Sequence, residues 1–422
     1  MVCRLGTTTT PPIIIPSYSL ISTSQIGRLY PYHINTMHYT QLIGSLFLLP
    51  CILSTSACVT PNPTPAAFTN FNDNIFFFPA ANAVNWKTLY ARSLQLPDES
   101  LLMTWENYPA EPPLVNHPIY KSVDGGATWS NFSAIKDQVN GWGMRFQPFL
   151  YTLPQAFGGY PAGTLLAAGV SAPFSLTGGV YIDLYVSQDS ARTWNFVSHI
   201  AFGNGPEDIT TGHAAIWEPF LMMYNGQLVC YFSDQRDSAH SQKLVHVTTN
   251  DLLTWSAAVD DVSYPTKNDR PGMTTVAYIA STQQYIMTYE YCGTAKCAVY
   301  YKTAPNPLNF NSATGIALVG NNTAKTVPKG SPYVIWTPNP AKTDGSGVII
   351  ASSGSLEPVL INDDAASPTG WKVVNVGQWS AYSRSLRIIT VQGKKKLLFG
   401  NGGNMGDPAC NSVANGVIEV PY

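Results

Sequence analysis

Two glutamates are candidates for chemistry because each interrupts an otherwise apolar segment. Glu218 lies in IWEPFL (residues 216–221), and Glu290 lies in YIMTYEY (residues 285–291). Burial among aromatic side chains raises the pKa of a carboxyl group, which suits a general acid. Two such groups together could serve as acid and nucleophile in a displacement reaction. Taken singly, each glutamate could equally be a structural residue bonded to neighbouring backbone.

Other polar and aromatic residues occur in short segments that could face the same site. Trp, Tyr and Asn side chains together offer a stacking surface and hydrogen bonds, although they also pack ordinary hairpins. Charged residues around positions 233–237 and 260–270 could line a pocket or join loops by ion pairs, and for residues 234–237 the structural interpretation is favoured. The candidates for ligand binding are Trp105, Asn107, Trp142, Arg145, Trp217, Asp234, Arg270, Tyr289, Tyr382 and Arg384.

A turn motif at residues 122–129 indicates which elements position these side chains. Its sequence, SVDGGATW, follows the spacing S-x-D-x-G-x-T-W, in which Asp124 can accept hydrogen bonds from its own turn. Degraded copies follow at residues 187–194, 248–255, 303–310 and 364–371, at steps of roughly 55 to 65 residues, a somewhat long period for one propeller blade. The spacing is similar to the Asp-box of sialidase-type β-propellers. Five marks, with one unmarked blade closed by both chain ends, predict an all-β, six-bladed β-propeller.

The composition favours one repeat fold over several domains. Charged residues make up 11% and aromatic residues 12% of the chain, and its 33 Gly and 32 Pro suit many short strands joined by turns. The net charge of -2 offers no basic surface for nucleic acid. The sequence has no C-x-x-C pair, His cluster or phosphate loop, so we expect neither a metal nor a cofactor. We expect a monomer.

The N-terminal residues predict secretion. Residues 1–36 are interpreted as an extension or a mispredicted start, and residues 37–57 combine a short apolar core with a small-residue exit, as in a secretory signal. An uncleaved signal anchor is the alternative, but the apolar run is short for a membrane span, and no stable membrane association is expected. A linker at residues 58–70 then precedes a catalytic domain at 71–422, whose first strand, near Ile75, should pair with one of the last strands.

Sequons and cysteines fit the same compartment. Asn131 and Asn321 begin potential glycosylation sites, although such triplets also occur by chance. Cys292 and Cys297 flank a short loop and could form a local disulfide or remain two buried thiols.

Six motifs, together with the turn pattern, resemble the fungal exo-α-1,5-L-arabinanases of glycoside hydrolase family 93. The resemblance extends from residue 71 to the end of the chain. It implies a secreted six-bladed propeller that releases arabinobiose from the non-reducing end of linear arabinan with retention of configuration, and it implies that Glu218 and Glu290 are the catalytic carboxylates. The motifs are TWENY (104–108), VNGWG (139–143), WEPF (217–220), YFSDQRD (231–237), DRPGM (269–273) and TYEY (288–291).

In a retaining mechanism one glutamate forms a covalent arabinosyl enzyme and the other protonates the leaving oxygen, with the carboxyl groups roughly 5 Å apart. The neighbouring Tyr289 and Tyr291 favour Glu290 as the acid and therefore Glu218 as the nucleophile. The resemblance supplies no residue set for a metal.

Two other functions share the predicted fold. A sialidase would need an arginine cluster for an anionic sugar, which could come from Arg92, Arg145, Arg270, Arg384 and Arg387. The segment YARS at residues 90–93, however, does not resemble the usual Phe-Arg-Ile-Pro entry of that family. A carbohydrate-binding propeller without activity would need the aromatic pocket but no carboxylate pair. Replacing either glutamate would then leave its function largely intact.

Overall fold

The computed structural model describes residues 70–175, 178–205, 214–406 and 408–422. These residues form β strands and two short 3-10 helices, η1 (Phe310–Ser312) and η2 (Pro408–Cys410), which confirms the all-β prediction. Among the described residues, no helix is long and apolar enough to cross a bilayer. The expected signal at residues 37–57, the N-terminal extension and the linker up to residue 69 lie outside the described residues.

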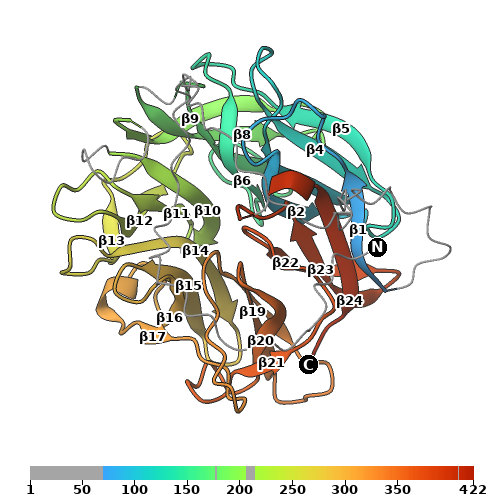
Figure 1. Cartoon of the computed structure of the whole chain (residues 1–422), viewed down its shortest axis with the longest axis vertical. Coiled ribbons are helices and arrows are strands. Elements are labelled where there is room, and N and C mark those ends of the chain that lie inside the picture. Colours follow the sequence, from blue (N-terminus) through green and yellow to red (C-terminus); the bar gives the residue numbers. More distant parts are fainter. Residues whose placement is uncertain (1–69, 176–177, 206–213, 407) are drawn as a thin grey trace, which may run out of the picture. The chain divides into compact units, whose positions relative to one another are not determined.

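The strands form six separate four-stranded antiparallel sheets. Five sheets use four consecutive strands in chain order, and the sixth takes its outermost strand from the start of the described chain (Figure 1). Blade 1 comprises β2 (Thr88–Gln95), β3 (Leu101–Asn107), β4 (His117–Ser122) and β5 (Ser130–Ile135); blade 2 comprises β6 (Met144–Thr152), β7 (Leu165–Ser171), β8 (Val180–Ser187) and β9 (Asn195–Gly203). Blade 3 comprises β10 (Ile216–Tyr224), β11 (Gln227–Asp234), β12 (Lys243–Thr249) and β13 (Val259–Val262); blade 4 comprises β14 (Arg270–Ile279), β15 (Gln284–Cys292), β16 (Ala298–Ala304) and β17 (Ile316–Ala317). Blade 5 comprises β18 (Tyr333–Pro338), β19 (Gly347–Ser353), β20 (Leu356–Asn362) and β21 (Lys372–Val374); blade 6 comprises β22 (Ser385–Val391), β23 (Lys394–Asn401), β24 (Val413–Glu419) and β1 (Phe71–Phe77).

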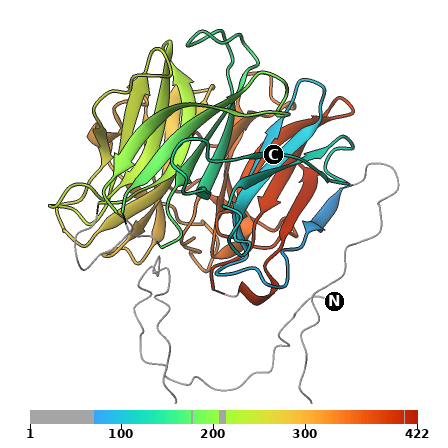
Figure 2. The same cartoon turned by 90° about the horizontal axis from the view of Figure 1, so that it is seen from above.

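The first strands of the six sheets form a closed ring. β2 contacts β6, β6 contacts β10, and the series continues through β14, β18 and β22 back to β2. A cyclic arrangement of four-stranded sheets around an axis is a propeller, and the innermost strands surround its centre. Figure 2 shows the same blades edge-on, with the strands running between two opposite faces. The prediction of six blades is therefore confirmed.

The ring closes between the two ends of the described chain. β1 pairs antiparallel with β24, and Ile75 lies opposite Ala414, as expected for a strand near Ile75 (Figure 1). Asn415 of β24 reaches from this pair to blade 1. Its Nδ2 donates to the Gly126 carbonyl (3.0 Å), and its Oδ1 accepts from the indole Nε1 of Trp129 (2.9 Å) and from Asn74 Nδ2 (3.3 Å).

The expected turns join the third and fourth strands of their blades. In blade 1, Asp124 accepts hydrogen bonds from the amide and hydroxyl of Thr128 (2.9 and 2.5 Å). Asp189 and Thr193 repeat this arrangement in blade 2 (2.9 and 2.6 Å), and Trp194 enters the apolar core between blades 1 and 2. Two of the degraded copies, in blades 3 and 5, begin at other residues than predicted.

In blade 3 the bonded pair is Thr249 and Asp251, one residue later than the predicted Thr248 and Asn250, because the turn is one residue shorter. In blade 5 the turn begins at Asn362, before the predicted start at Asp364, because the Asn362 side chain takes the place of the first Ser and accepts the amides of Asp364 and Ala366 (2.9 and 3.1 Å).

The closure contact predicts a stability effect. Replacing Asn415 by Ala removes its hydrogen bonds to the Trp129 indole, the Gly126 carbonyl and Asn74. The indole and the Gly126 carbonyl stay bonded to each other, so we expect the free energy of unfolding to fall by roughly 1–3 kcal/mol. Urea unfolding followed by circular dichroism measures the change. Asn309→Ala is the control, since Asn309 is exposed and its side chain caps no helix amide. Equal stability of the two variants would contradict the closing role of Asn415.

Candidate active site

A β-bulge interrupts the innermost strand of blades 1 to 4. In each case the pairing with the second strand shifts register, and a residue other than glycine takes a positive φ at the shift. A bulge bends its strand and changes the direction of the local side chains. The four residues are Tyr90 (φ 55°), Gln147 (φ 44°), Glu218 (φ 67°) and Met273 (φ 56°).

Glu218 is buried at the bulge of β10, with 8% of its surface exposed. Its Oε2 accepts hydrogen bonds from the Ser233 hydroxyl (2.6 Å) and from the Met273 amide of the next blade (2.8 Å). Burial, followed by the negative charge of Glu290, raises the pKa of Glu218 to about 7 despite these hydrogen bonds. A carboxyl group with this pKa holds a proton near neutral pH and can release it, as a general acid must.

Glu290 lies near the end of β15 and is held in a similar way by the following blade. Its Oε2 accepts the amide of Ser331 (2.9 Å), a residue with φ 46°. Burial raises the pKa of Glu290, while the Ser331 amide and the positive charge of Arg270 favour its ionised form. For Glu218, the largest effect of a neighbouring charge is instead that of the negative Glu290, which raises its pKa. The two carboxyl groups therefore differ in environment, and Glu290 is the better placed to stay ionised.

Gly272 separates the two carboxylates. A Cβ at this glycine would lie 3.5 Å from Oε1 of Glu290 and 3.6 Å from Oε2 of Glu218. Because both distances start at one point, the two oxygens cannot be farther apart than their sum, about 7 Å. That limit includes the roughly 5 Å expected for a retaining pair. The same Cβ would be 2.6 Å from Nε2 of Gln242, so a side chain here would displace its neighbours and fill the space between the carboxylates.

Glu106 is a third buried carboxyl group at the same end of the strands. Its Oε2 accepts the Tyr108 hydroxyl (2.5 Å), and its Oε1 accepts the amide of Gln147 from the next blade (2.9 Å). Burial raises its pKa to about 7, although both hydrogen bonds and the charge of Arg92 oppose the shift. The negative charge of Glu106 in turn contributes to the raised pKa of Glu218. The site thus contains three interacting carboxyl groups, two of which were expected.

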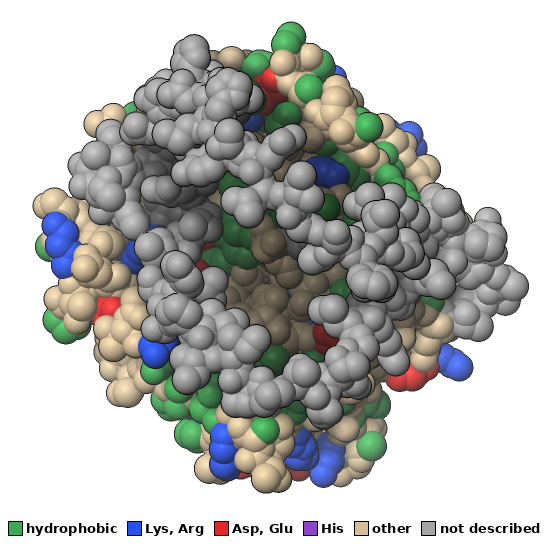
Figure 3. All heavy atoms as spheres, viewed as in Figure 1, with side chains coloured by type: hydrophobic (Ala, Val, Ile, Leu, Met, Phe, Trp, Pro, Cys, Tyr) green, Lys and Arg blue, Asp and Glu red, His purple; other side chains and the backbone are tan. Residues whose placement is uncertain are grey.

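Aromatic and cationic side chains border these carboxyl groups. The Arg92 guanidinium lies over the Tyr90 ring, 3.8 Å from its centroid, and Nη2 of Arg92 donates to the Ser383 hydroxyl (3.3 Å). Burial and the negative charges of Glu218, Glu290 and Glu106 raise the pKa of the Tyr382 hydroxyl. Figure 3 shows a face that is hollowed at its centre, with hydrophobic side chains gathered on the wall of the hollow.

The structure brings two of the predicted ligand-binding residues, Arg270 and Tyr382, to the carboxylates, and a third, Trp217, is the chain neighbour of Glu218. Trp217 precedes Glu218 on β10, and its ring meets Phe146 edge-on (5.5 Å between centroids). Arg270 acts on the charge of Glu290, and its Nη2 donates to Gln242 Oε1 (3.0 Å). Tyr382 interacts with all three glutamates. Whether these residues contact a substrate stays a prediction.

Four other candidates lie at the margin of the site. Arg145 forms an ion pair with Glu111 (2.6 Å), and Asp234 forms one with Arg236 (2.7 Å), which fits the favoured structural interpretation of Asp234. Trp142 stacks on Tyr181 of blade 2 (5.6 Å between centroids) and is half-buried. Asn107 ends β3, opposite Thr88.

Three candidates need correction because they are buried away from the carboxylates. Trp105 is fully buried among Phe76, Phe77 and Tyr120, on the face of β3 opposite to Glu106. The Tyr289 hydroxyl bonds to that of Tyr264 (2.8 Å). Alternation along a strand explains both errors, since neighbouring side chains point to opposite faces. Arg384 is fully buried and donates to the backbone carbonyls of residues 357, 378 and 379.

The same alternation removes the basis for Glu290 as the acid. Tyr291, like Tyr289, points away from Glu290: its ring stacks on Tyr264 (3.9 Å between centroids), and its hydroxyl donates to Asp269 (2.6 Å). Neither tyrosine raises the pKa of Glu290.

The five arginines proposed for a sialidase do not form one cluster. They bond to different groups around the ring: Arg92 to Ser383, Arg145 to Glu111, Arg270 to Gln242, Arg384 to backbone carbonyls and Arg387 to the Ser93 carbonyl. This arrangement does not favour recognition of an anionic sugar.

Sequence reasoning missed Glu106, Tyr90, Gly272, Gln242 and Ser331 as parts of the site. The only available signal was for Glu106, which lies in the quoted TWENY motif and follows the apolar strand 101–105 as Glu290 follows its own. Gly272 and Ser331 contribute a missing side chain and a backbone amide, whereas Tyr90 and Gln242 contact arginines through their side chains, and no sequence pattern indicated either contact. Cys292 and Cys297 form a disulfide directly after Glu290, which was one of the two expected alternatives. In the described part of the chain, no three His, Cys, Asp or Glu residues are grouped so that they could hold a metal.

Comparison with solved structures finds close relatives. The GH93 α-L-arabinofuranosidase of Fusarium graminearum, solved with arabinobiose, is 42% identical, with a TM-score of 0.77 over 83% of this chain and 98% of that chain. The α-L-arabinanase of Penicillium chrysogenum, also solved with arabinobiose, is 41% identical with the same coverage and TM-score. A mutant of the NanB sialidase of Streptococcus pneumoniae shares the fold alone, at 8% identity and a TM-score of 0.52 over 82% of this chain and 70% of that chain. No protein-family model and no curated protein sequence matches the chain.

The raised pKa of Glu218 predicts a pH dependence of stability. A carboxyl group whose pKa is higher in the folded state stabilises the fold at low pH, and this contribution is lost as the pH rises through about 7. We expect Glu218→Gln to raise the free energy of unfolding at pH 8, on the order of 2–3 kcal/mol, with little effect at pH 4. Urea unfolding at both pH values tests this, with the exposed Glu357→Gln as control. If the free energies of unfolding of Glu218→Gln and Glu357→Gln changed equally with pH, the predicted cost of burying the Glu218 carboxylate would be refuted.

Proposed function

The chain belongs to glycoside hydrolase family 93, and on that premise we propose that it is an exo-α-1,5-L-arabinanase, which releases arabinobiose from the non-reducing end of linear arabinan. The observation that carries this proposal is the pair of buried carboxylates across Gly272, in a chain 41–42% identical to two enzymes solved with arabinobiose. The family resemblance of the sequence motifs is thereby confirmed.

We propose a retaining mechanism in which Glu290 is the nucleophile and Glu218 the acid and base. The Glu290 carboxylate attacks the anomeric carbon while Glu218 gives its proton to the departing oxygen, and the glycosidic bond breaks. The Glu218 carboxylate then takes a proton from water as that water attacks the same carbon, which releases Glu290. This assignment reverses the one based on sequence. Its support is the Arg270 charge beside Glu290, together with the burial and negative charge that raise the pKa of Glu218 to about 7.

Residues around the pair would hold the sugar. Trp217 and Tyr382 offer ring faces, and Arg270 offers hydrogen bonds to hydroxyl groups, as a neutral sugar requires. Trp142, half-buried at the edge of blade 2, could bind a sugar farther along the polymer. We further propose that the protein is secreted and acts as a monomer. The support for secretion is the signal-like segment at residues 37–57.

Product analysis tests the proposed activity and roles together. We expect arabinobiose from linear α-1,5-arabinan and no product from a sialyl substrate. Glu218→Gln and Glu290→Gln should each lower kcat by roughly 10³-fold or more on arabinan, since each removes a chemical participant. An aryl arabinoside with an acidic phenol needs no proton for bond cleavage, so Glu218→Gln should still form the glycosyl enzyme from it and release a burst of phenol. The same burst from Glu290→Gln would overturn the assignment.

Glu106 should influence the pH profile without taking part in the reaction. Its negative charge raises the pKa of Glu218, so Glu106→Gln should lower that pKa. Because the acid must be protonated, the alkaline limb of the kcat/KM profile should then move to lower pH. A matched control is Asp261→Asn, a buried carboxyl of blade 3 bonded to His246 (3.0 Å). If the alkaline limb moved in Asp261→Asn and not in Glu106→Gln, the proposed effect of Glu106 on the pKa of Glu218 would be ruled out.

A further inference from the structure

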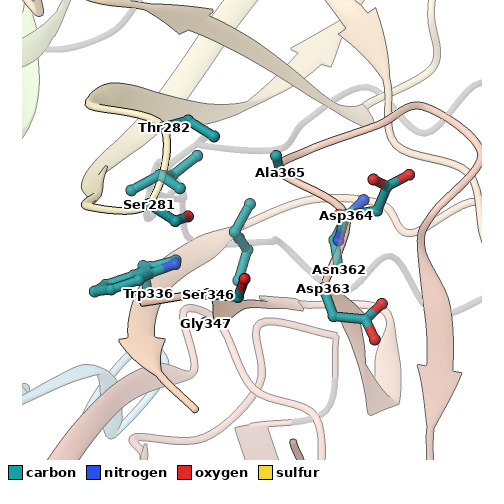
Figure 4. A pocket seen from close by; sticks show the side chains of 11 residues that line it. Ser281, Thr282, Trp336, Ser346, Gly347, Asn362, Asp363, Asp364 and Ala365 are labelled. Atoms are coloured by element: carbon teal, nitrogen blue, oxygen red, sulfur yellow. Dashed lines mark hydrogen bonds between the residues drawn. The ribbon is translucent and has the colours of Figure 1, made fainter. Parts of the chain in front are cut away.

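A second pocket lies between blades 4 and 5, at the opposite end of the strands from the catalytic carboxylates. It has a volume of about 250 Å³ and is lined by the β14–β15 turn, the start of β19, Trp336 of β18 and the turn after β20 (Figure 4). β14 begins at Arg270, beside Glu290, and ends at Ile279, which lines the pocket. Ten strand residues cover roughly 30 Å, so the two sites are separate.

The turn of blade 5 leaves a carboxylate open to this pocket. In blades 1 to 3, the turn aspartates Asp124, Asp189 and Asp251 each accept a hydrogen bond from a threonine of their own turn. Asp364 holds the same place in blade 5, but an extra residue moves Thr369 away, and the Thr369 hydroxyl lies near that of Ser367 (3.4 Å). The Asp364 carboxylate has no hydrogen bond or ion pair with any residue that the structure describes. This aspartate is therefore an acceptor without a role in its own turn.

An indole ring lies across the pocket from Asp364. Trp336 is half-buried and passes over Gly347, where a Cβ would lie 2.5 Å from the ring. In Figure 4 the Trp336 ring and the hydroxyls of Ser281 and Thr282 lie on one side, and the turn with Asp364 lies on the other, with open space between. The Trp336 Nε1 has no hydrogen-bond partner among the described residues. The two sides together present a ring and unused polar groups.

This combination suits a neutral sugar. An aromatic ring packs against the C–H face of a sugar, while a carboxylate and hydroxyls bond to its hydroxyl groups. The adjacent Asp363 already pairs with Lys372 (2.9 Å), so the unpaired Asp364 makes the pocket unfavourable for anions. The volume is just below the roughly 300–1,000 Å³ of sites for drug-sized ligands, which limits the ligand to one or two rings.

We propose that this pocket is a non-catalytic site for one or two neutral arabinofuranose rings of the arabinan chain. The choice of arabinan as the polymer rests on the proposed function, whereas the preference for a neutral sugar rests on the pocket alone. Binding at a second site about one blade length away keeps the enzyme on a polymer between cleavage events, because the second contact is then made at a high effective concentration. Short substrates, which cannot span both sites, gain nothing from it.

Affinity electrophoresis in gels that contain linear arabinan tests the site on the full chain. Glu290→Gln serves as background so that the polymer stays intact. Adding Trp336→Ala or Asp364→Ala should weaken the retardation roughly three- to tenfold, as the loss of one aromatic or charge-assisted contact implies. Tyr278→Ala is the matched control, because Tyr278 is an exposed aromatic residue of β14 that does not line the pocket. The protein with Tyr278→Ala added should migrate like Glu290→Gln itself.

Unchanged retardation of both pocket variants, with melting temperatures equal to that of the background, would overturn the proposal. If Trp336→Ala reduced both the retardation and the melting temperature, its result would not separate binding from folding, and Asp364→Ala would decide. The turn of Asp364 is held by Asn362 and not by the aspartate, so reduced retardation of Asp364→Ala would support the site and unchanged retardation would overturn it. In the otherwise unaltered enzyme, the pocket variants should lower the rate on polymer relative to arabinotriose. If the chain released no sugar from arabinan, the proposed function would fail, yet retardation that depends on Trp336 would still establish the binding site.

Discussion

Hydrogen bonds between neighbouring blades fix the carboxyl groups, and the rest of the site depends on them. Each donor is a backbone amide at a residue with positive φ: Gln147 donates to Glu106, Met273 to Glu218, and Ser331 to Glu290. Such a conformation costs a non-glycine residue on the order of 1–3 kcal/mol, and it persists only where surrounding packing enforces it. The packing here comes from the ring of innermost strands, so closure of the propeller and formation of the site are one event.

This constraint separates the two faces of the propeller. The bulges and carboxyl groups lie where inner strands begin and second strands end, while the Asp-containing turns lie at the other end of the blades. The turns satisfy their own polar groups in blades 1 and 2 and pack a tryptophan between blades. Variation of a turn therefore leaves the carboxyl groups in place, which explains how blades 3 and 5 tolerate degraded copies of the motif.

The fold and the two main glutamates could be predicted from sequence because both leave a pattern in it. The turn motif recurs at the spacing of a blade, and Glu218 and Glu290 interrupt apolar runs. On the innermost strands the direction of side chains could not be predicted, because one inserted residue reverses the alternation along a strand. Trp105 and Tyr289 lie on second strands without an inserted residue, where regular alternation turns them away from Glu106 and Glu290. Gly272 and Ser331 contribute a missing side chain and a backbone amide, which sequence alone does not reveal.

Glu106 and Glu290 occupy equivalent positions in blades 1 and 4, and they show that this position can be structural in one blade and reactive in another. Each lies on the second strand of its blade, opposite the residue before the bulge: Leu89 faces Glu106, and Gly272 faces Glu290. Both accept an amide from the next blade. In blade 1, however, Tyr108 occupies the second carboxylate oxygen and Leu89 fills the opposite position. In blade 4, Oε1 of Glu290 faces the space over Gly272. A nucleophile needs an open oxygen, and the absence of a side chain at position 272 supplies it.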